Sequence, residues 1–231
     1  MARCLNIKIV ISGPLQSGKS TYVRRVDQKS LNVEARGSDN QLYTVGMDLG
    51  SIKLNGFDVF LFGTPGLLRF SVMRDVVVDG ADGLVYIFDA SNPASDEEAI
   101  IILNQVRKIL KPNTPIVFLA NKSDLPEARS PEAIKEINKL PDCKIFAAST
   151  KTGLNIEESL KYIVNEVFNK YKETLAIMRD FETNIRGLAV KLNMDKEQTR
   201  DFLNNLEIKR FIEIDRIKRT YKVREGLQNL T

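Results

Sequence analysis

Gly13-Pro14-Leu15-Gln16-Ser17-Gly18-Lys19-Ser20 has the spacing of a phosphate-binding loop, G-x-x-x-x-G-K-[ST]. It follows the apolar run Ile7–Ile11, typical of a buried parallel strand, and precedes a helix-like segment. Its glycines let successive backbone N–H groups point at phosphate oxygens, and the positive end of the helix faces the same anion. Lys19 can reach the β- and γ-phosphates of a nucleotide, and the Ser20 hydroxyl is a hard oxygen ligand suited to Mg²⁺.

A second polar loop indicates which base is bound. Asn121-Lys122-Ser123-Asp124 directly follows Thr114–Ala120, which reads as another buried strand. The Asp124 carboxylate can accept from both the ring N1–H and the exocyclic amino group of guanine, whereas adenine would leave it unpaired. Asn121 can hydrogen-bond the base and hold the loop, and the Lys122 stem can lie over the base plane. Behind a phosphate-binding loop, this pattern predicts a guanine nucleotide.

Residues 4 to about 170 resemble a small Ras-like GTPase domain. Leu42–Asp48 is similar to the first switch segment, and Gly63–Phe70 occupies the place of the second. Ala148–Lys151 resembles the last guanine-contacting loop, with Thr150 in place of the usual alanine. The Gly-Thr-Pro-Gly of the second switch, in place of Asp-x-x-Gly, resembles a prokaryotic or archaeal branch of these GTPases.

The two loops and the resemblance together predict the site residues. The catalytic set is Lys19, Thr44 and Gly66, and the Mg²⁺ ligands are Ser20 and Thr44. The nucleotide-binding set is Gly13, Gln16, Ser17, Gly18, Lys19, Ser20, Thr21, Asn121, Lys122, Asp124, Ser149, Thr150 and Lys151. The expected cofactors are GTP or GDP and Mg²⁺.

The chain departs from the family pattern at two catalytic positions. Leu67 stands where the resemblance expects the glutamine that orients the attacking water, and leucine can neither donate to water nor accept from it. We therefore expect slow intrinsic hydrolysis with nucleotide binding retained. The alternative is that Leu67 only packs, while another switch residue (Arg69, Gln41 or Asp48) orients the water.

Gly63 replaces the aspartate that helps to hold the magnesium shell in the family. Asp48 could supply an outer-shell carboxylate in its place, or Ser20 and Thr44 could suffice. The sequence leaves both possibilities open.

Alternating strand and helix patterns predict an α/β fold: the P-loop GTPase fold, with a mixed, mostly parallel six-stranded sheet flanked by helices. Asn55-Gly56 predicts a hairpin and hence one antiparallel edge. Ser95 is the expected N-cap of the third helix, and Asp89 fits a turn better than catalysis. Strands are expected near 5–11, 47–54, 57–62, 83–88, 115–120 and 143–147, and helices near 19–28, 68–79, 96–110, 131–139 and 155–172.

The last sixty residues suggest a second module, so we expect domains at 1–172 and 173–231. Helical spacing in Ile185–Leu192 and Lys196–Lys209, with Asp195 as N-cap, precedes two period-two stretches, Phe211–Asp215 and Arg219–Val223. This order of helices and hairpin resembles a winged helix in pattern, without a diagnostic motif.

The charge of this module leaves its partner open. Residues 208–225 hold seven basic side chains against three acidic ones, an excess of four that equals the formal +4 of the whole chain. Such a cluster suits phosphates of nucleic acid, but also an acidic protein or an anionic membrane surface. A protein-interaction or structural role is the favoured interpretation, with nucleic acid second.

Composition narrows the functional class. The absence of histidine argues against zinc sites and histidine-based catalysis, and Cys4 and Cys143 read as small buried side chains. No signal peptide, membrane span or prenylation site is expected, which favours a cytoplasmic protein. The predicted function is a GTP/GDP switch with an unidentified effector or activating protein. The alternative is a GTP-binding adaptor or transcription-type regulator with little turnover, whose output is the C-terminal module.

Overall fold

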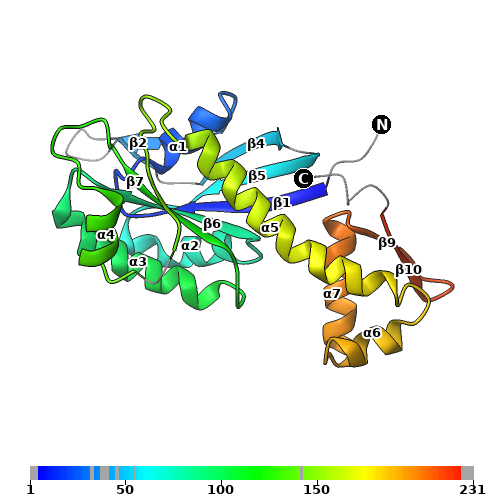
Figure 1. The fold of residues 1–231 in the computed structure, drawn as a ribbon. Helices are drawn as coiled ribbons and strands as arrows, with labels where there is room; N and C mark the ends of the chain where they lie inside the picture. Colours follow the sequence, from blue (N-terminus) through cyan, green and yellow to red (C-terminus); the bar gives the residue numbers. More distant parts are fainter. Residues whose placement is uncertain are drawn as a thin grey trace. The chain divides into compact units, whose positions relative to one another are not determined.

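The computed structural model describes residues 5–31, 34–36, 42–44, 47–54, 56–140 and 143–224. Its centre is a six-stranded sheet with the strand order β4-β5-β1-β6-β7-β8 (Figure 1). The strands are β4 (Asp48–Leu54), β5 (Phe57–Gly63), β1 (Leu5–Ser12), β6 (Gly83–Asp89), β7 (Ile116–Asn121) and β8 (Ile145–Ala147). This mixed sheet confirms the predicted P-loop GTPase fold.

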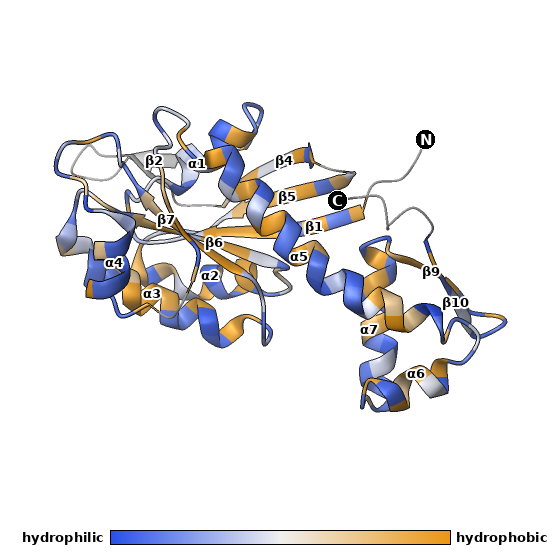
Figure 2. Ribbon diagram, viewed as in Figure 1, coloured by the Kyte–Doolittle hydropathy of each residue, from blue (hydrophilic) through white to orange (hydrophobic). Residues whose placement is uncertain are grey.

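The inner strands are largely hydrophobic because both faces of the sheet are covered. β6 is buried at every residue, and Figure 2 shows β6 and β7 mostly hydrophobic, whereas the helices alternate between polar and apolar residues. β1 pairs in parallel with β6, β6 with β7, and β7 with β8. β4 and β5 are neighbours joined by a short reversal at Gly56, so they run antiparallel, as predicted.

Helices follow the strands in the order expected of a βα-repeating chain. They are α1 (Lys19–Val26), α2 (Ser71–Val78) with the short 3₁₀ turn η1 (Leu68–Phe70) before it, α3 (Asp96–Ile109) preceded by η2 (Pro93–Ser95), α4 (Pro131–Ile137) and α5 (Ile156–Arg179). Side chains from α2, α3 and α4 pack with β6 and β7 in one buried cluster that includes Val78, Leu103 and Ile134.

Two local expectations were wrong, and one small sheet was not predicted. The last helix of the predicted domain does not end at 172 but continues as α5 to Arg179. β2 (Glu34–Arg36) and β3 (Leu42–Thr44) form a two-stranded antiparallel sheet that no pattern predicted. Ser95 occupies the N-cap position of α3 without capping it, because its hydroxyl donates to the Asn92 carbonyl oxygen (2.8 Å) instead.

The C-terminal elements appear in the expected order. α6 (Ile185–Lys191) and α7 (Lys196–Ile208) precede an antiparallel hairpin of β9 (Ile212–Asp215) and β10 (Thr220–Val223). Asp195 caps α7 as predicted: its carboxylate accepts from the Gln198 backbone N–H, and the Gln198 side chain accepts from the Asp195 N–H. Whether these elements act as a winged helix stays a prediction.

The chain divides into two compact units. One comprises Met1–Ile7, Lys53–Asp58 and Asn165–Thr231, and the other comprises Lys8–Ile52 and Val59–Val164. In the first unit, the Asn6 N–H donates to the Lys209 carbonyl oxygen (3.1 Å), and the Phe57 and Phe168 rings meet edge to face at 5.2 Å. The end of the β4–β5 hairpin thus belongs to the same unit as the C-terminal elements. The domain boundary at 172 stays a prediction.

Candidate functional site

The phosphate-binding loop lies between β1 and α1, where the sequence predicts it. Gly18, the N-cap of α1, has φ 104°, and Gly13 has φ 150°. A Cβ on Gly13 would collide with the Ile87 carbonyl oxygen, and one on Gly18 would collide with the Asn121 side-chain nitrogen. Both positions therefore require glycine for space as well as for backbone conformation.

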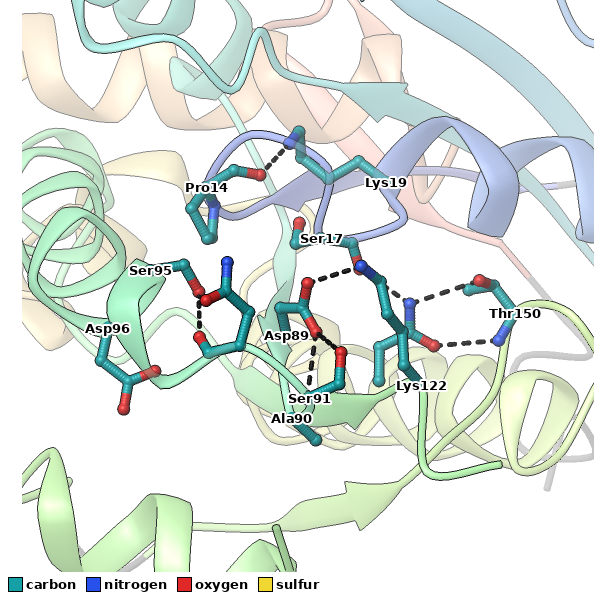
Figure 3. A network of polar contacts seen from close by, with 12 residues as sticks. Pro14, Ser17, Lys19, Asp89, Ala90, Ser91, Ser95, Asp96, Lys122 and Thr150 are labelled. Atoms are coloured by element: carbon teal, nitrogen blue, oxygen red, sulfur yellow. Dashed lines mark hydrogen bonds and ion pairs between the residues drawn. The ribbon is translucent and has the colours of Figure 1, made fainter. Parts of the chain in front are cut away.

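The Lys19 ammonium group is buried inside this loop. Its Nζ donates to the Pro14 carbonyl oxygen at 2.5 Å (Figure 3). Burial is the main reason that the pKa of Lys19 falls to about 8; nearby Arg74 lowers it further, while the Asp48 carboxylate partly offsets the effect. A Cβ on Gly66, in the second switch segment, would lie only 2.7 Å from Lys19 Nζ. The structure thus brings together two of the three predicted catalytic residues, Lys19 and Gly66.

Asp48 fills the space that Gly63 leaves empty. The Asp48 side chain is only 1% exposed, and its Oδ2 accepts from the Ser20 hydroxyl at 2.8 Å. A Cβ on Gly63 would lie 2.8 Å from Asp48 Cβ and closer still to Oδ2. Hydroxyl and carboxylate oxygens side by side are the donor types that Mg²⁺ prefers, so these residues fit a magnesium site.

The backbone carbonyl group of Leu67 accepts a hydrogen bond from the buried side chain of Arg74. Arg74 on α2 is fully buried; its Nη2 donates to the Leu67 carbonyl oxygen (2.8 Å) and its Nη1 donates to Gln105 Oε1 (2.8 Å). Arg74 Nη2 also lies 3.4 Å from the Pro65 carbonyl oxygen. Arg74 therefore ties the second switch loop to α2 and α3. Burial lowers its pKa from the ordinary arginine value.

Asn121 joins the phosphate loop to the loop after β8. This fully buried side chain donates from Nδ2 to the Ser17 carbonyl oxygen (2.7 Å) and accepts at Oδ1 from the Thr150 N–H (2.9 Å). Its Nδ2 also lies 3.3 Å from Thr150 Oγ1 (Figure 3). The Asn121 side chain thus links its own loop to the phosphate loop and to the loop after β8. This is the loop-holding role expected of it.

Asp124 and Lys122 lie on the same loop with different exposure. Asp124 is exposed, and a hydrogen bond from the Ser149 side chain lowers the pKa of its carboxyl group. Lys122 Nζ lies 2.5 Å from Asp89 Oδ2. Asp89 Oδ1 accepts from the N–H and hydroxyl of Ser91, at 3.1 and 2.7 Å. The turn role of Asp89 is confirmed, and it has a second role as the partner of Lys122.

The remaining predicted residues have less definite surroundings. Thr21, Gln16 and Lys151 are exposed at the rim of the loops. The backbone of Thr44 lies in β3, but its side chain lies outside the described residues, as does Gln41, so the predicted roles of both stay predictions.

The sequence analysis did not predict the Asp89–Lys122 pair or the hydrogen bonds by which Arg74 holds the second switch loop. The first had a signal: Asp89 and Asn121 end two consecutive strands, and the carboxyl ends of parallel strands lie at one edge of a sheet. Arg74 had none, because a lone arginine in a helix pattern reads as a surface residue. Nothing in the sequence indicated that its guanidinium group turns inward.

Comparisons with known proteins agree with this architecture. The sequence profile of the Ras family matches residues 8–169. An uncharacterised protein of Methanocaldococcus jannaschii is 30% identical over 133 residues, covering 57% of this chain and 80% of the relative. The Ras-related protein Rab-5B of Plasmodium falciparum is 26% identical, covering 75% and 84%. The mutual gliding-motility protein MglA of Myxococcus xanthus is also 26% identical, covering 74% and 95%.

Proposed function

Because the chain belongs to the Ras family of small GTPases, we propose that it is a guanine-nucleotide switch with slow intrinsic GTP hydrolysis. The proposal rests on one observation: Lys19, Gly66 and the hydrogen-bonded pair of Asp48 and Ser20 lie together at one phosphate-binding loop. Such a loop binds phosphate through backbone N–H groups, the helix terminus and one lysine.

Each of these residues has a defined task in the proposed switch. Lys19 exchanges the Pro14 carbonyl oxygen for phosphate oxygens when nucleotide binds. Ser20 and Thr44 would hold Mg²⁺, and Asp48 would supply the outer-shell carboxylate that Gly63 cannot. The bound ion would neutralise negative charge that develops on the phosphates. Gly66, free of a side chain, lets the second switch loop approach the γ-phosphate.

The slow rate follows from what Leu67 lacks. Phosphoryl transfer depends on positioning and electrostatics, and a leucine cannot orient the attacking water. The guanidinium group of Arg74 is already engaged by the Leu67 carbonyl oxygen and by Gln105. These contacts support a site that binds GTP but needs a partner protein to supply the missing water-positioning group.

The proposed output is the C-terminal module. The β4–β5 hairpin begins at Asp48, whose carboxylate accepts from Ser20 of the phosphate loop, and its residues Lys53–Asp58 belong to the compact unit that contains the C-terminal elements. This continuity supports a module whose state depends on the nucleotide.

Single-turnover hydrolysis of Mg²⁺·GTP tests the proposal. We expect slow turnover in the wild type and an increase on the order of tenfold to a hundredfold in Leu67→Gln, because that change restores a water-positioning group. Leu68→Gln is the matched control, since Leu68 is the next residue and is 39% exposed. Fast wild-type turnover would overturn the slow-switch proposal. Negligible turnover in both proteins would favour the GTP-binding adaptor.

A further inference from the structure

The turn between β9 and β10 exposes an apolar side chain at its tip. Ile217 is 96% exposed, more than any other large apolar residue in the described part of the chain. Below the turn, Tyr221 and Val223 of β10 are buried, and the Tyr221 hydroxyl donates to the Met178 carbonyl oxygen at 2.7 Å. The base of the hairpin is thus anchored, while its tip points into solvent.

The turn has a defined conformation. Asp215 Oδ1 accepts from the backbone N–H groups of Ile217 (3.0 Å) and Lys218 (2.9 Å). Arg219 has φ 54°, which reverses the chain into β10. A contact made by this tip would therefore need little further ordering of the backbone.

Positive charge is concentrated at the same tip. Lys218 and Arg219 are exposed and form no ion pair with any residue that the structure describes. By contrast, Arg216 makes two hydrogen bonds to the Glu207 carboxylate, at 3.1 and 2.6 Å, and Arg224 is 3.1 Å from Glu213. Arg216 and Arg224 are therefore paired with carboxylates of the module, whereas the cations of Lys218 and Arg219 lie beside Ile217.

We propose that this tip, residues 216–219, docks on an anionic lipid bilayer. Ile217 enters the boundary between headgroups and acyl chains, while Lys218 and Arg219 contact lipid phosphates and carboxylates. An apolar side chain flanked by cations is the combination that binds membrane interfaces, because one part gains an apolar medium and the other gains the negative surface potential.

The neighbouring helix argues against duplex DNA as the partner. The exposed charges of α7 are Lys196, Glu197, Arg200 and Asp201, which sum to zero. Arg200 lies 3.6 Å from a Glu197 oxygen and 3.4 Å from an Asp201 oxygen. Laid in a groove, α7 would bring carboxylates to DNA phosphates, and two tip cations neutralise few phosphates. A bilayer needs only the tip.

Vesicle sedimentation of the full-length GDP-bound protein tests this docking. We expect binding to phosphatidylcholine vesicles only when they contain phosphatidylserine. Ile217→Asn and the double variant Lys218→Glu/Arg219→Glu should each lower the partition coefficient by about fivefold or more. Val190→Asn should not, because Val190 is an equally apolar residue, 83% exposed, on α6. Fluorescent GDP binding by every variant verifies that the GTPase domain is folded.

Two binding results, and one spectroscopic result, would overturn the proposal. One is equal sedimentation of the wild type and both tip variants. The other is tip-dependent binding to duplex DNA without binding to phosphatidylserine vesicles, which would assign the tip to nucleic acid. In Ile217→Trp, a blue shift of tryptophan emission on adding phosphatidylserine vesicles is expected, and an unchanged spectrum would exclude insertion. Since nucleotide binding is scored separately, failure here leaves the proposed GTPase function untouched.

Discussion

Asp48 occupies the volume that a side chain at position 63 would need, and its carboxylate accepts a hydrogen bond from Ser20. The two residues lie on adjacent strands, Asp48 at the start of β4 and Gly63 at the end of β5. In the proposed switch, Asp48 on the neighbouring strand therefore provides the carboxylate that the resemblance expects at position 63. The Asp48 carboxylate fits there only because residue 63 is a glycine.

This arrangement predicts a compensating double variant. Asp48→Ala should weaken the Mg²⁺ dependence of GTP affinity, and Gly63→Asp should also weaken it, because two carboxylates would compete for one buried space. Asp48→Ala/Gly63→Asp should recover most of the dependence. Titration of fluorescent GTP at several Mg²⁺ concentrations measures the effect. Wild-type behaviour of Asp48→Ala would contradict the outer-shell role.

At mildly alkaline pH, the protein should take up a proton at Lys19 when it binds nucleotide. Burial lowers the pKa of Lys19 to about 8 in the free protein, whereas a bound phosphate favours the charged ammonium and raises the pKa again. Affinity should therefore be constant below pH 8 and fall as pH rises above it. Calorimetry near pH 9 in two buffers of different ionisation enthalpy measures the uptake. Uptake that persists in Lys19→Met would assign it to another group.

Base specificity should depend on Asp124. Asp124→Asn replaces one of the two carboxylate oxygens that would accept from the guanine N1–H and amino group with an NH₂ donor, which suits the xanthine carbonyl. GTP affinity should therefore fall on the order of a hundredfold while xanthosine triphosphate binding improves. Glu127→Gln is the control, since Glu127 is an exposed acid in the same segment. Competition binding with both nucleotides decides the matter, and an unchanged preference would refute the assignment.

The Asp89–Lys122 pair should contribute to nucleotide affinity by positioning Lys122. Asp89→Asn removes the charge that holds Lys122 Nζ at 2.5 Å, and we expect a loss of roughly threefold to tenfold in GDP affinity. Asp96→Asn is the matched control: Asp96 pairs with Arg129 at 2.5 Å and should affect thermal stability instead. Equal losses of GDP affinity in both variants would indicate a general structural effect.

The accuracy of the sequence predictions depended on how specific each local pattern was. Asp195 was identified as a helix cap because its partner, Gln198, lies three residues away. Ser95 looked equally suitable, yet its hydroxyl found the Asn92 carbonyl oxygen instead. α5 extends past residue 172 to Arg179 because its additional turns bury Leu175 and Met178. β2 and β3 escaped prediction because three-residue strands carry too little periodicity to detect.

The sequence by itself determined the phosphate loop, the guanine-recognition loop and the alternation of strands and helices, because each rests on residues close together in the chain. Only the tertiary structure decided that Asp48 replaces a side chain at Gly63, that Arg74 turns inward to hold Leu67, and that Asp89 pairs with Lys122. These contacts join residues seven to thirty-three positions apart on separate elements. Local spacing does not fix them, since packing of the sheet and its helices sets which side chains meet.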